Sequence, residues 1–296
     1  YERLNSFCIK NSIISSATLG YTSLNRSGYS RFYNNTCNGN IIIQENSASN
    51  LPILIKDCTI HGRVHANTTT KSKILRCTIT SSLYSKESYN NSLGSSTFLY
   101  CSIVNLNGNH NYSGNYINCS INNFSGMLQG NFYFNNCNIK MLSCYPTGEN
   151  RTITFENCNI INSSLIANYS SNGATITFNN CIINNIDFLL KLPHYSMKYP
   201  ITLNGNTCSS TGTNGLIYLY DDRVQSPTSA AIKQETISLI NNSIDLSNSK
   251  YVITGISENT KNNINIFVSK NNYTPPTLLL CDPSSQKSSN INITEN

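Results

Sequence analysis

The sequence predicts an all-β protein that folds as a single right-handed parallel β-helix, a solenoid of about twelve coils. Three observations carry this prediction. A short pattern recurs along the chain, its copies lie 18 to 25 residues apart as far as position 206, and no stretch shows the 3.6-residue period of helical repeats. The clearest copies run from Ile53 to Ile60, from Phe132 to Ile139, from Ile153 to Ile160 and from Ile176 to Ile183.

Each copy predicts two short strands joined by a corner. Alternate residues of a strand share a face, so Ile153 pairs with Phe155 and Cys158 pairs with Ile160 on the buried side. Phe155 and Cys158 are three positions apart, so the alternation of buried and outward residues shifts by one residue between the two pairs. One interior is kept only if the chain bends between them, and Asn157 suits that bend because Asn tolerates a left-handed backbone.

The residue after the corner is small in every copy, and we call its position the slot. We predict that this position stacks from coil to coil. The predicted slots are Ser12, Thr36, Cys58, Cys77, Cys101, Cys119, Cys137, Cys158, Cys181, Asn206, Asn242 and Asn271.

Two other architectures fit the sequence less well than the β-helix. Leucine-rich repeats share the period but need a ladder of Leu that this chain lacks. An antiparallel β-sandwich also has many short strands, but it does not need the same corner chemistry in each copy.

The predicted β-helix spans residues 1–273, and an extended C-terminal tail spans 274–296. Two longer insertions interrupt the later coils. The first runs from Asp187 to Tyr199 and has a short helical turn before Pro193. The second runs from Ser209 to Glu235.

The chain contains 12 Cys, and seven of them fall at one repeat position. This regularity predicts a column of buried, reduced thiols that act as small apolar side chains. The competing interpretation is an extracellular disulfide scaffold. The Cys and His residues show no zinc-binding spacing, so neither a metal nor another cofactor is expected.

The formal net charge of +6 comes from basic residues that are scattered along the sequence. They form no basic run with interleaved aromatic residues, so nucleic-acid binding is not expected. No apolar run is long enough to span a membrane, so membrane insertion is not expected either.

The candidate site lies in the two insertions, because loops on a rigid scaffold often carry function. Aromatic rings can stack on sugars while carboxylates bind hydroxyl groups, and paired carboxylates can also hydrolyse glycosides. The alternative is a solvated turn with no ligand. The predicted ligand-binding residues are Tyr218, Tyr220, Arg223 and Tyr195, and the candidate catalytic residues are Asp221, Asp222, Asp187 and His194.

The Asn-Cys-Xaa-Ile copies, such as the one around Cys158, resemble right-handed parallel β-helix proteins of the pectate-lyase-like type, and more narrowly the tail spikes and fibres of bacteriophages. The resemblance covers roughly residues 4–273. The lyases of this type carry calcium-binding Asp clusters and a basic catalytic residue, a pattern this chain lacks.

The resemblance implies a structural or receptor-binding component of a virion tail, assembled in a host cytoplasm as a homotrimer with other virion proteins. Its partner would be a host surface polysaccharide. The alternative is a secreted polysaccharide-degrading enzyme, a hydrolase or lyase, on the same scaffold; the sparse carboxylates favour a binding protein over an enzyme.

Overall fold

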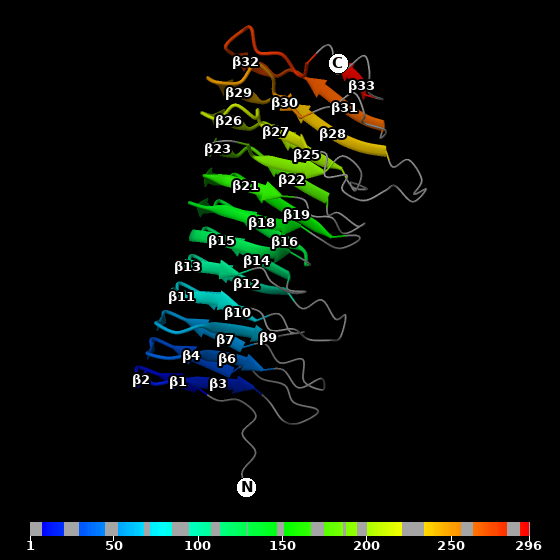
Figure 1. Cartoon of the computed structure of the whole chain (residues 1–296). Helices are drawn as coiled ribbons and strands as arrows, with labels where there is room; N and C mark the ends of the chain where they lie inside the picture. Colours follow the sequence, from blue (N-terminus) through cyan, green and yellow to red (C-terminus); the bar gives the residue numbers. More distant parts are fainter. Residues whose placement is uncertain are drawn as a thin grey trace. The chain divides into compact units, whose positions relative to one another are not determined.

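The computed structural model describes residues 8–20, 30–44, 53–67, 72–84, 95–107, 113–128, 130–146, 151–166, 175–185, 188–193, 200–220, 234–255, 263–282 and 291–295. Within these ranges the regular elements are β-strands, and the named strands pair in parallel. The chain divides into two compact units, Tyr1–Ile139 and Lys140–Asn296. The predicted parallel β-helix is confirmed (Figure 1); its handedness and its number of coils stay predictions.

In unit 1 the strands stack as three faces. The first sheet contains β1 (Cys8–Lys10), β4 (Ser30–Tyr33), β7 (Ile53–Lys56), β10 (Lys73–Leu75), β12 (Ser95–Leu99), β14 (Ser113–Ile117) and β16 (Phe132–Asn135). The second contains β2 (Ile13–Ile14), β5 (Thr36–Cys37), β8 (Thr59–Ile60), β11 (Thr78–Tyr84), β13 (Ser102–Asn107), β15 (Ser120–Leu128) and β17 (Asn138–Ile139). The third contains β3 (Ala17–Gly20), β6 (Ile41–Gln44), β9 (Val64–Asn67) and the later halves of β11, β13 and β15.

Unit 2 repeats this plan. Its first sheet contains β19 (Thr152–Glu156), β22 (Thr175–Asn179), β25 (Ile201–Asn204), β28 (Gln234–Ile240), β31 (Asn263–Ser269) and β33 (Ile291–Glu295). The second contains β20 (Asn159–Ile161), β23 (Ile182–Asn185), β26 (Thr207–Ser210), β29 (Ser243–Leu246) and β32 (Asn272–Thr274). The third contains β18 (Leu142–Pro146), β21 (Ser163–Ile166), β24 (Leu190–Pro193), β27 (Ile217–Tyr220) and β30 (Ile253–Thr254).

The interior is built from the alternating apolar residues of each copy. Ile153 and Phe155 are fully buried, whereas Thr154 between them is half-exposed. In unit 1 the rings of Phe98, Tyr116 and Phe134 stack from coil to coil with centroids 4.8 Å apart at each step. This distance equals the spacing between neighbouring strands, so the in-register pairing itself aligns the rings.

The corners adopt the predicted left-handed conformation. Asn136, Asn157 and Asn180 have φ values of 51°, 52° and 52°. The same position is Gly205 in one coil, where a Cβ atom would lie 2.4 Å from the side-chain oxygen of Asn180. In the other coils it is Asn11, Asn34, Asn118, Asn241, Asp57, Arg76, Tyr100 or Lys270, all with positive φ. Asn is therefore the commonest corner residue, but Arg76, Tyr100 and Lys270 hold the left-handed conformation without an intrinsic preference for it.

One predicted slot is wrong by a single residue. The second corner residue is Asn34, with a φ of 50°, so the slot of that coil is Asn35 and not Thr36. Asn35 is buried, while Thr36 starts β5 and is half-exposed. Cys37, two positions after Asn35, occupies the Ile position of the template and pairs with Ile14 and Ile60 of the neighbouring coils.

The insertions are shorter than predicted. The expected helical turn before Pro193 is wrong, since residues 190–193 form β24 and Leu189 and Leu190 are buried. The start of the second expected insertion belongs to the regular coil, because Ser209 and Ser210 end β26 and residues 217–220 form β27.

Beyond residue 273, the segment predicted as a tail includes β33, which pairs in parallel with β31. The domain boundary at 273 stays a prediction. None of the described residues forms a helix of the length and hydropathy that a bilayer span requires.

Candidate functional site

Of the predicted site residues, the structure places Tyr218 and the backbone of Tyr220, both on β27 in the third sheet of unit 2. The other predicted ligand-binding and catalytic residues lie outside the described residues. They are Asp187, His194, Tyr195, Asp221, Asp222 and Arg223.

Tyr218 lies on the outer side of the β-helix because its neighbour Ile217 points into the core and is fully buried. The Tyr218 side chain is half-exposed. Its ring centroid lies 6.1 Å from that of Phe188, and the two ring planes are tilted by 33°. Together these rings form an aromatic pair on the surface just ahead of β24, the neighbouring strand.

The strands around Tyr218 are fixed by in-register pairing. Lys191 of β24 and Thr254 of β30 are its backbone partners on the two sides. The Thr254 hydroxyl donates a hydrogen bond to the carbonyl of Asn214, which ties β30 to the turn before β27. The aromatic pair therefore rests on a hydrogen-bonded sheet, a support that keeps binding side chains in a defined position.

The two insertions leave the β-helix from adjacent strands. Pro193 at the end of β24 and Tyr220 at the end of β27 are register partners. His194 and Asp221 follow them directly in the sequence. The two insertions therefore start from neighbouring positions of one sheet, and the site predicted in them stays a prediction.

This arrangement can bind a flat ligand with mixed polarity. An aromatic pair offers apolar area together with the Tyr hydroxyl, a combination that suits partly apolar, hydroxyl-rich rings such as sugars. Phe188 was missed in the sequence because it lies in the stretch predicted to be a helical turn. The signal that could have identified Phe188 is the pair of buried residues Leu189 and Leu190 that follows it. Two consecutive buried residues mark a bend, and this bend turns the preceding side chain outward.

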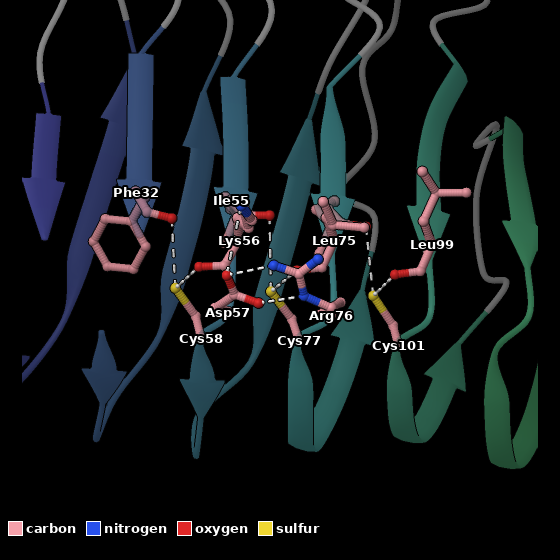
Figure 2. A network of polar contacts seen from close by, with 11 residues as sticks. Phe32, Ile55, Lys56, Asp57, Cys58, Leu75, Arg76, Cys77, Leu99 and Cys101 are labelled. Carbon is pink, nitrogen blue, oxygen red and sulfur yellow. Dashed lines mark hydrogen bonds and ion pairs between the residues drawn. The ribbon is translucent and has the colours of Figure 1, made fainter. Parts of the chain in front are cut away.

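The predicted thiol column is confirmed as a column of buried cysteines, and none of the 12 Cys, all of which lie in the described ranges, forms a disulfide. Figure 2 shows three of its members, Cys58, Cys77 and Cys101, beneath the ends of successive strands of the first sheet. The Cys101 thiol lies 3.4 Å from the carbonyl of Leu99 and 3.5 Å from that of Ile74. Burial raises the pKa of Cys144 well above its usual value and that of Cys208 to about 12. Buried neutral thiols of this kind are structural rather than nucleophilic.

The carboxylates at the corners are also structural. Asp57 holds a corner position with a φ of 55°, and its two carboxylate oxygens accept hydrogen bonds of 2.6 and 2.8 Å from the guanidinium of Arg76 one coil later (Figure 2). Glu156 ends β19 immediately before the corner at Asn157. Asp57 is therefore a turn residue held by an ion pair. Over the described ranges, no group of three or more His, Cys, Asp or Glu residues is arranged to bind a metal ion.

Comparison with protein-family models, with curated proteins and with solved structures found no match to this chain.

Proposed function

We propose that this protein is a carbohydrate-binding structural component of a virus particle, a tail spike or tail fibre that recognises a glycan on the surface of its host. The proposal draws on the resemblance of the Asn-Cys-Xaa-Ile copies to such proteins and on the parallel β-helix that these copies form. In this proposal the chain works as a homotrimer together with other virion proteins, it is assembled in the host cytoplasm, and it takes no cofactor.

The observation that carries the proposal is the aromatic pair of Phe188 and Tyr218 beside the starting points of both insertions. A sugar ring could stack on Tyr218 while polar side chains of the insertions bind its hydroxyl groups. Tyr220, Arg223 and Tyr195 are the proposed further contacts. A binding site needs only this aromatic and polar surface on a rigid support.

A second candidate function, polysaccharide cleavage, is favoured by the position of the insertions. His194 and Asp221 follow register partners in the sequence, so two chemically active residues start from adjacent coils. However, Asp221 and Asp222 are consecutive, and consecutive side chains of an extended chain point to opposite faces. They cannot by themselves bracket a glycosidic bond, which needs two carboxyl groups on either side of the scissile bond.

The test compares binding and cleavage on a panel of purified bacterial surface polysaccharides. We expect at least one of them to bind, and the Tyr218→Ala variant to bind it about tenfold more weakly, the effect of losing one aromatic contact. Tyr133→Ala is the matched control, since Tyr133 is also a half-exposed tyrosine on the outer side of a strand, in unit 1. Equal losses in both variants would contradict the assigned site.

The same samples decide between binding and catalysis. Newly formed reducing ends report hydrolysis, and absorbance of an unsaturated sugar reports elimination. We expect no sustained release of either product. Continuous product release by the wild type that disappears in the Asp222→Asn variant would show that the protein is an enzyme and would contradict the binding-protein proposal.

A further inference from the structure

The formal charge of this chain is concentrated in unit 1. Residues 1–139 contain ten Lys and Arg and four Asp and Glu, whereas residues 140–296 contain ten of each. Unit 1 therefore carries a net charge of +6 and unit 2 a net charge of zero, which together account for the +6 of the whole chain. Residues 88–139 contain no charged side chain, so the charge of unit 1 lies entirely in its first coils.

Four basic residues that look scattered in the sequence share one surface in the fold. Lys10, Arg31, Lys56 and Lys73 lie on β1, β4, β7 and β10, the first four strands of the first sheet (Figure 1). On β4, β7 and β10 these residues flank core residues such as Phe32, Ile55 and Ile74, so they point outward. We call the outer side of these four strands the basic face.

The cations of the basic face follow a regular two-column pattern. The strand register places Arg31, Leu54 and Lys73 in one column and Lys10, Tyr33 and Lys56 in the other. Each column thus has a cation, an apolar or aromatic residue and a cation. Two strand spacings separate the cations of one column, a distance of about 9.6 Å.

Three of these cations are exposed, and no carboxylate among the described residues pairs with them. They are Lys10, Arg31 and Lys73. Lys56 is more enclosed, since its ammonium lies 5.9 Å from the ring centroid of Tyr33 and 3.8 Å from a carboxylate oxygen of Asp57. That carboxylate is itself held by Arg76 at 2.6 Å. The positive potential of the face is therefore only partly compensated.

We infer that the basic face binds a linear acidic polysaccharide, one whose sugars carry carboxylates. Sugar rings would lie over Leu54 and Tyr33, and carboxylates on alternate sugars would reach the cations on either side. The repeat of about 9.6 Å within a column is close to the length of a disaccharide, and it follows from strand stacking alone. Rows of exposed cations attract and orient such a polyanion before contact.

The pattern fits a polysaccharide better than a nucleic acid. A nucleic-acid strand carries a phosphate about every 3.4 Å along its axis, which is far denser than the cations of either column. Single-stranded nucleic acids also need a row of aromatic rings on which successive bases can stack. Between the cations of the two columns there is one ring, Tyr33, and the other column has Leu54 in that place.

This inference deepens the proposed function and rests on it, because it names a charge class for the glycan and adds a second contact surface in unit 1. The site at Tyr218 in unit 2 does not depend on it. The binding role of the basic face and that of the Tyr218 site can therefore be disproved independently.

The test uses polygalacturonate as the probe and its fully methyl-esterified form as the uncharged control. We expect the intact chain to bind polygalacturonate, to lose affinity as salt is raised, and not to bind the ester. A triple variant, Lys10→Gln with Arg31→Gln and Lys73→Gln, should bind at least roughly tenfold more weakly at low salt, since three exposed ionic contacts are lost. Its far-ultraviolet circular dichroism and melting midpoint should stay unchanged, because all three side chains point outward.

The matched control removes the same charge from unit 2 through Lys140→Gln, Arg151→Gln and Lys250→Gln, and it should keep the affinity of the wild type. An equal loss in both triple variants would mean that only net charge matters and would overturn the assigned face. If an oligothymidylate of equal charge binds more tightly than polygalacturonate, the ligand of the basic face is a nucleic acid and the polysaccharide proposal is wrong. If the first triple variant binds like wild type while Tyr218→Ala loses its glycan, the basic face is wrong and the proposed function stands.

Discussion

Coils with cysteine in the slot and coils with asparagine there meet the same need by different chemistry. In the asparagine coils the slot side chain accepts a hydrogen bond from the backbone N–H of the slot residue one coil earlier, and the Oδ1 atom of Asn206 accepts it from Cys181 at 2.8 Å. The Cys101 thiol instead donates toward the carbonyls of Leu99 and Ile74. Because the corner bends the chain at this point, the Cys181 N–H would otherwise be buried without a partner.

The two side chains also approach the same carbonyl, three residues before the preceding slot. The Nδ2 atom of Asn206 donates to Phe178 at 3.0 Å, and the Cys101 thiol lies 3.5 Å from the carbonyl of Ile74. The amide makes strong bonds, while the thiol is a weak donor and a weak acceptor. A hydrogen bond with Cys119, together with burial, raises the pKa of Cys101, so the thiol stays neutral. The comparison shows that the slot requires a small hydrogen-bonding group as well as a small volume.

The largest expected effect is the loss of a slot amide. Asn206→Leu leaves the Cys181 N–H without its acceptor and removes one hydrogen bond from the Phe178 carbonyl, in a site where Asn206 is 1% exposed. A buried orphan costs about 1–3 kcal/mol, so we expect the free energy of unfolding to fall by an amount near the upper end of that range. Urea unfolding measures the loss, and hydrogen exchange at the Cys181 amide should accelerate strongly. Unchanged exchange there would contradict the hydrogen-bonding role of the slot.

A smaller effect is expected in a thiol slot. Cys101→Ala removes the weak donor that faces the carbonyls of Ile74 and Leu99, and we expect the free energy of unfolding to fall by an amount near the lower end of about 1–3 kcal/mol. Cys101→Asn is the informative partner, because its amide could bond both Cys77 and Ile74 as Asn206 bonds its own neighbours. We expect Cys101→Asn to be more stable than Cys101→Ala in the same urea titration. The reverse order would show that the thiol slots select volume alone.

The sequence predicts the coils well because their signal is local. A corner needs positive φ, a slot must be small, and apolar residues must alternate, so each coil can be recognised from eight residues such as 153–160. The prediction is wrong by one residue at the second coil, where the corner is Asn34 and the slot is Asn35. It also fails at β24, where Leu189 and Leu190 look helical in isolation and only their pairing with the neighbouring coil makes them part of a sheet.

The surfaces were harder to predict because they depend on register between distant residues. Arg31 and Lys73 become members of one column only through the pairing of both with Leu54. The aromatic pair has the same origin, since Phe188 reaches Tyr218 only because β24 and β27 are neighbours. Composition gives the number of charges and rings, and the coil lengths determine which of them meet.

The corner residues of successive coils contact one another at the surface and offer the same comparison there. Substituting them is expected to have the smallest effect on stability. Asn34 donates to Asn11 at 2.8 Å in one pair of coils, and an ion pair between Arg76 and Asp57 takes that role in another. The hydrogen bond from Arg76 lowers the pKa of Asp57 below its usual value of 3.8. A depressed carboxyl pKa stabilises the folded state above the ordinary pKa, and this contribution disappears as the pH falls through the folded value.

We therefore expect Arg76→Gln to be slightly less stable than wild type at neutral pH and equally stable in strong acid, where Asp57 is protonated in both proteins. Added salt should shrink the difference at neutral pH, because both side chains are exposed and the pair is screened. Lys56→Gln is the matched control; Lys56 is 3.8 Å from the same carboxylate, so its removal should change the acid profile less. A difference that persists unchanged into strong acid would mean that Arg76 supports the corner by packing, and the ion pair would then not be the counterpart of the asparagine bond.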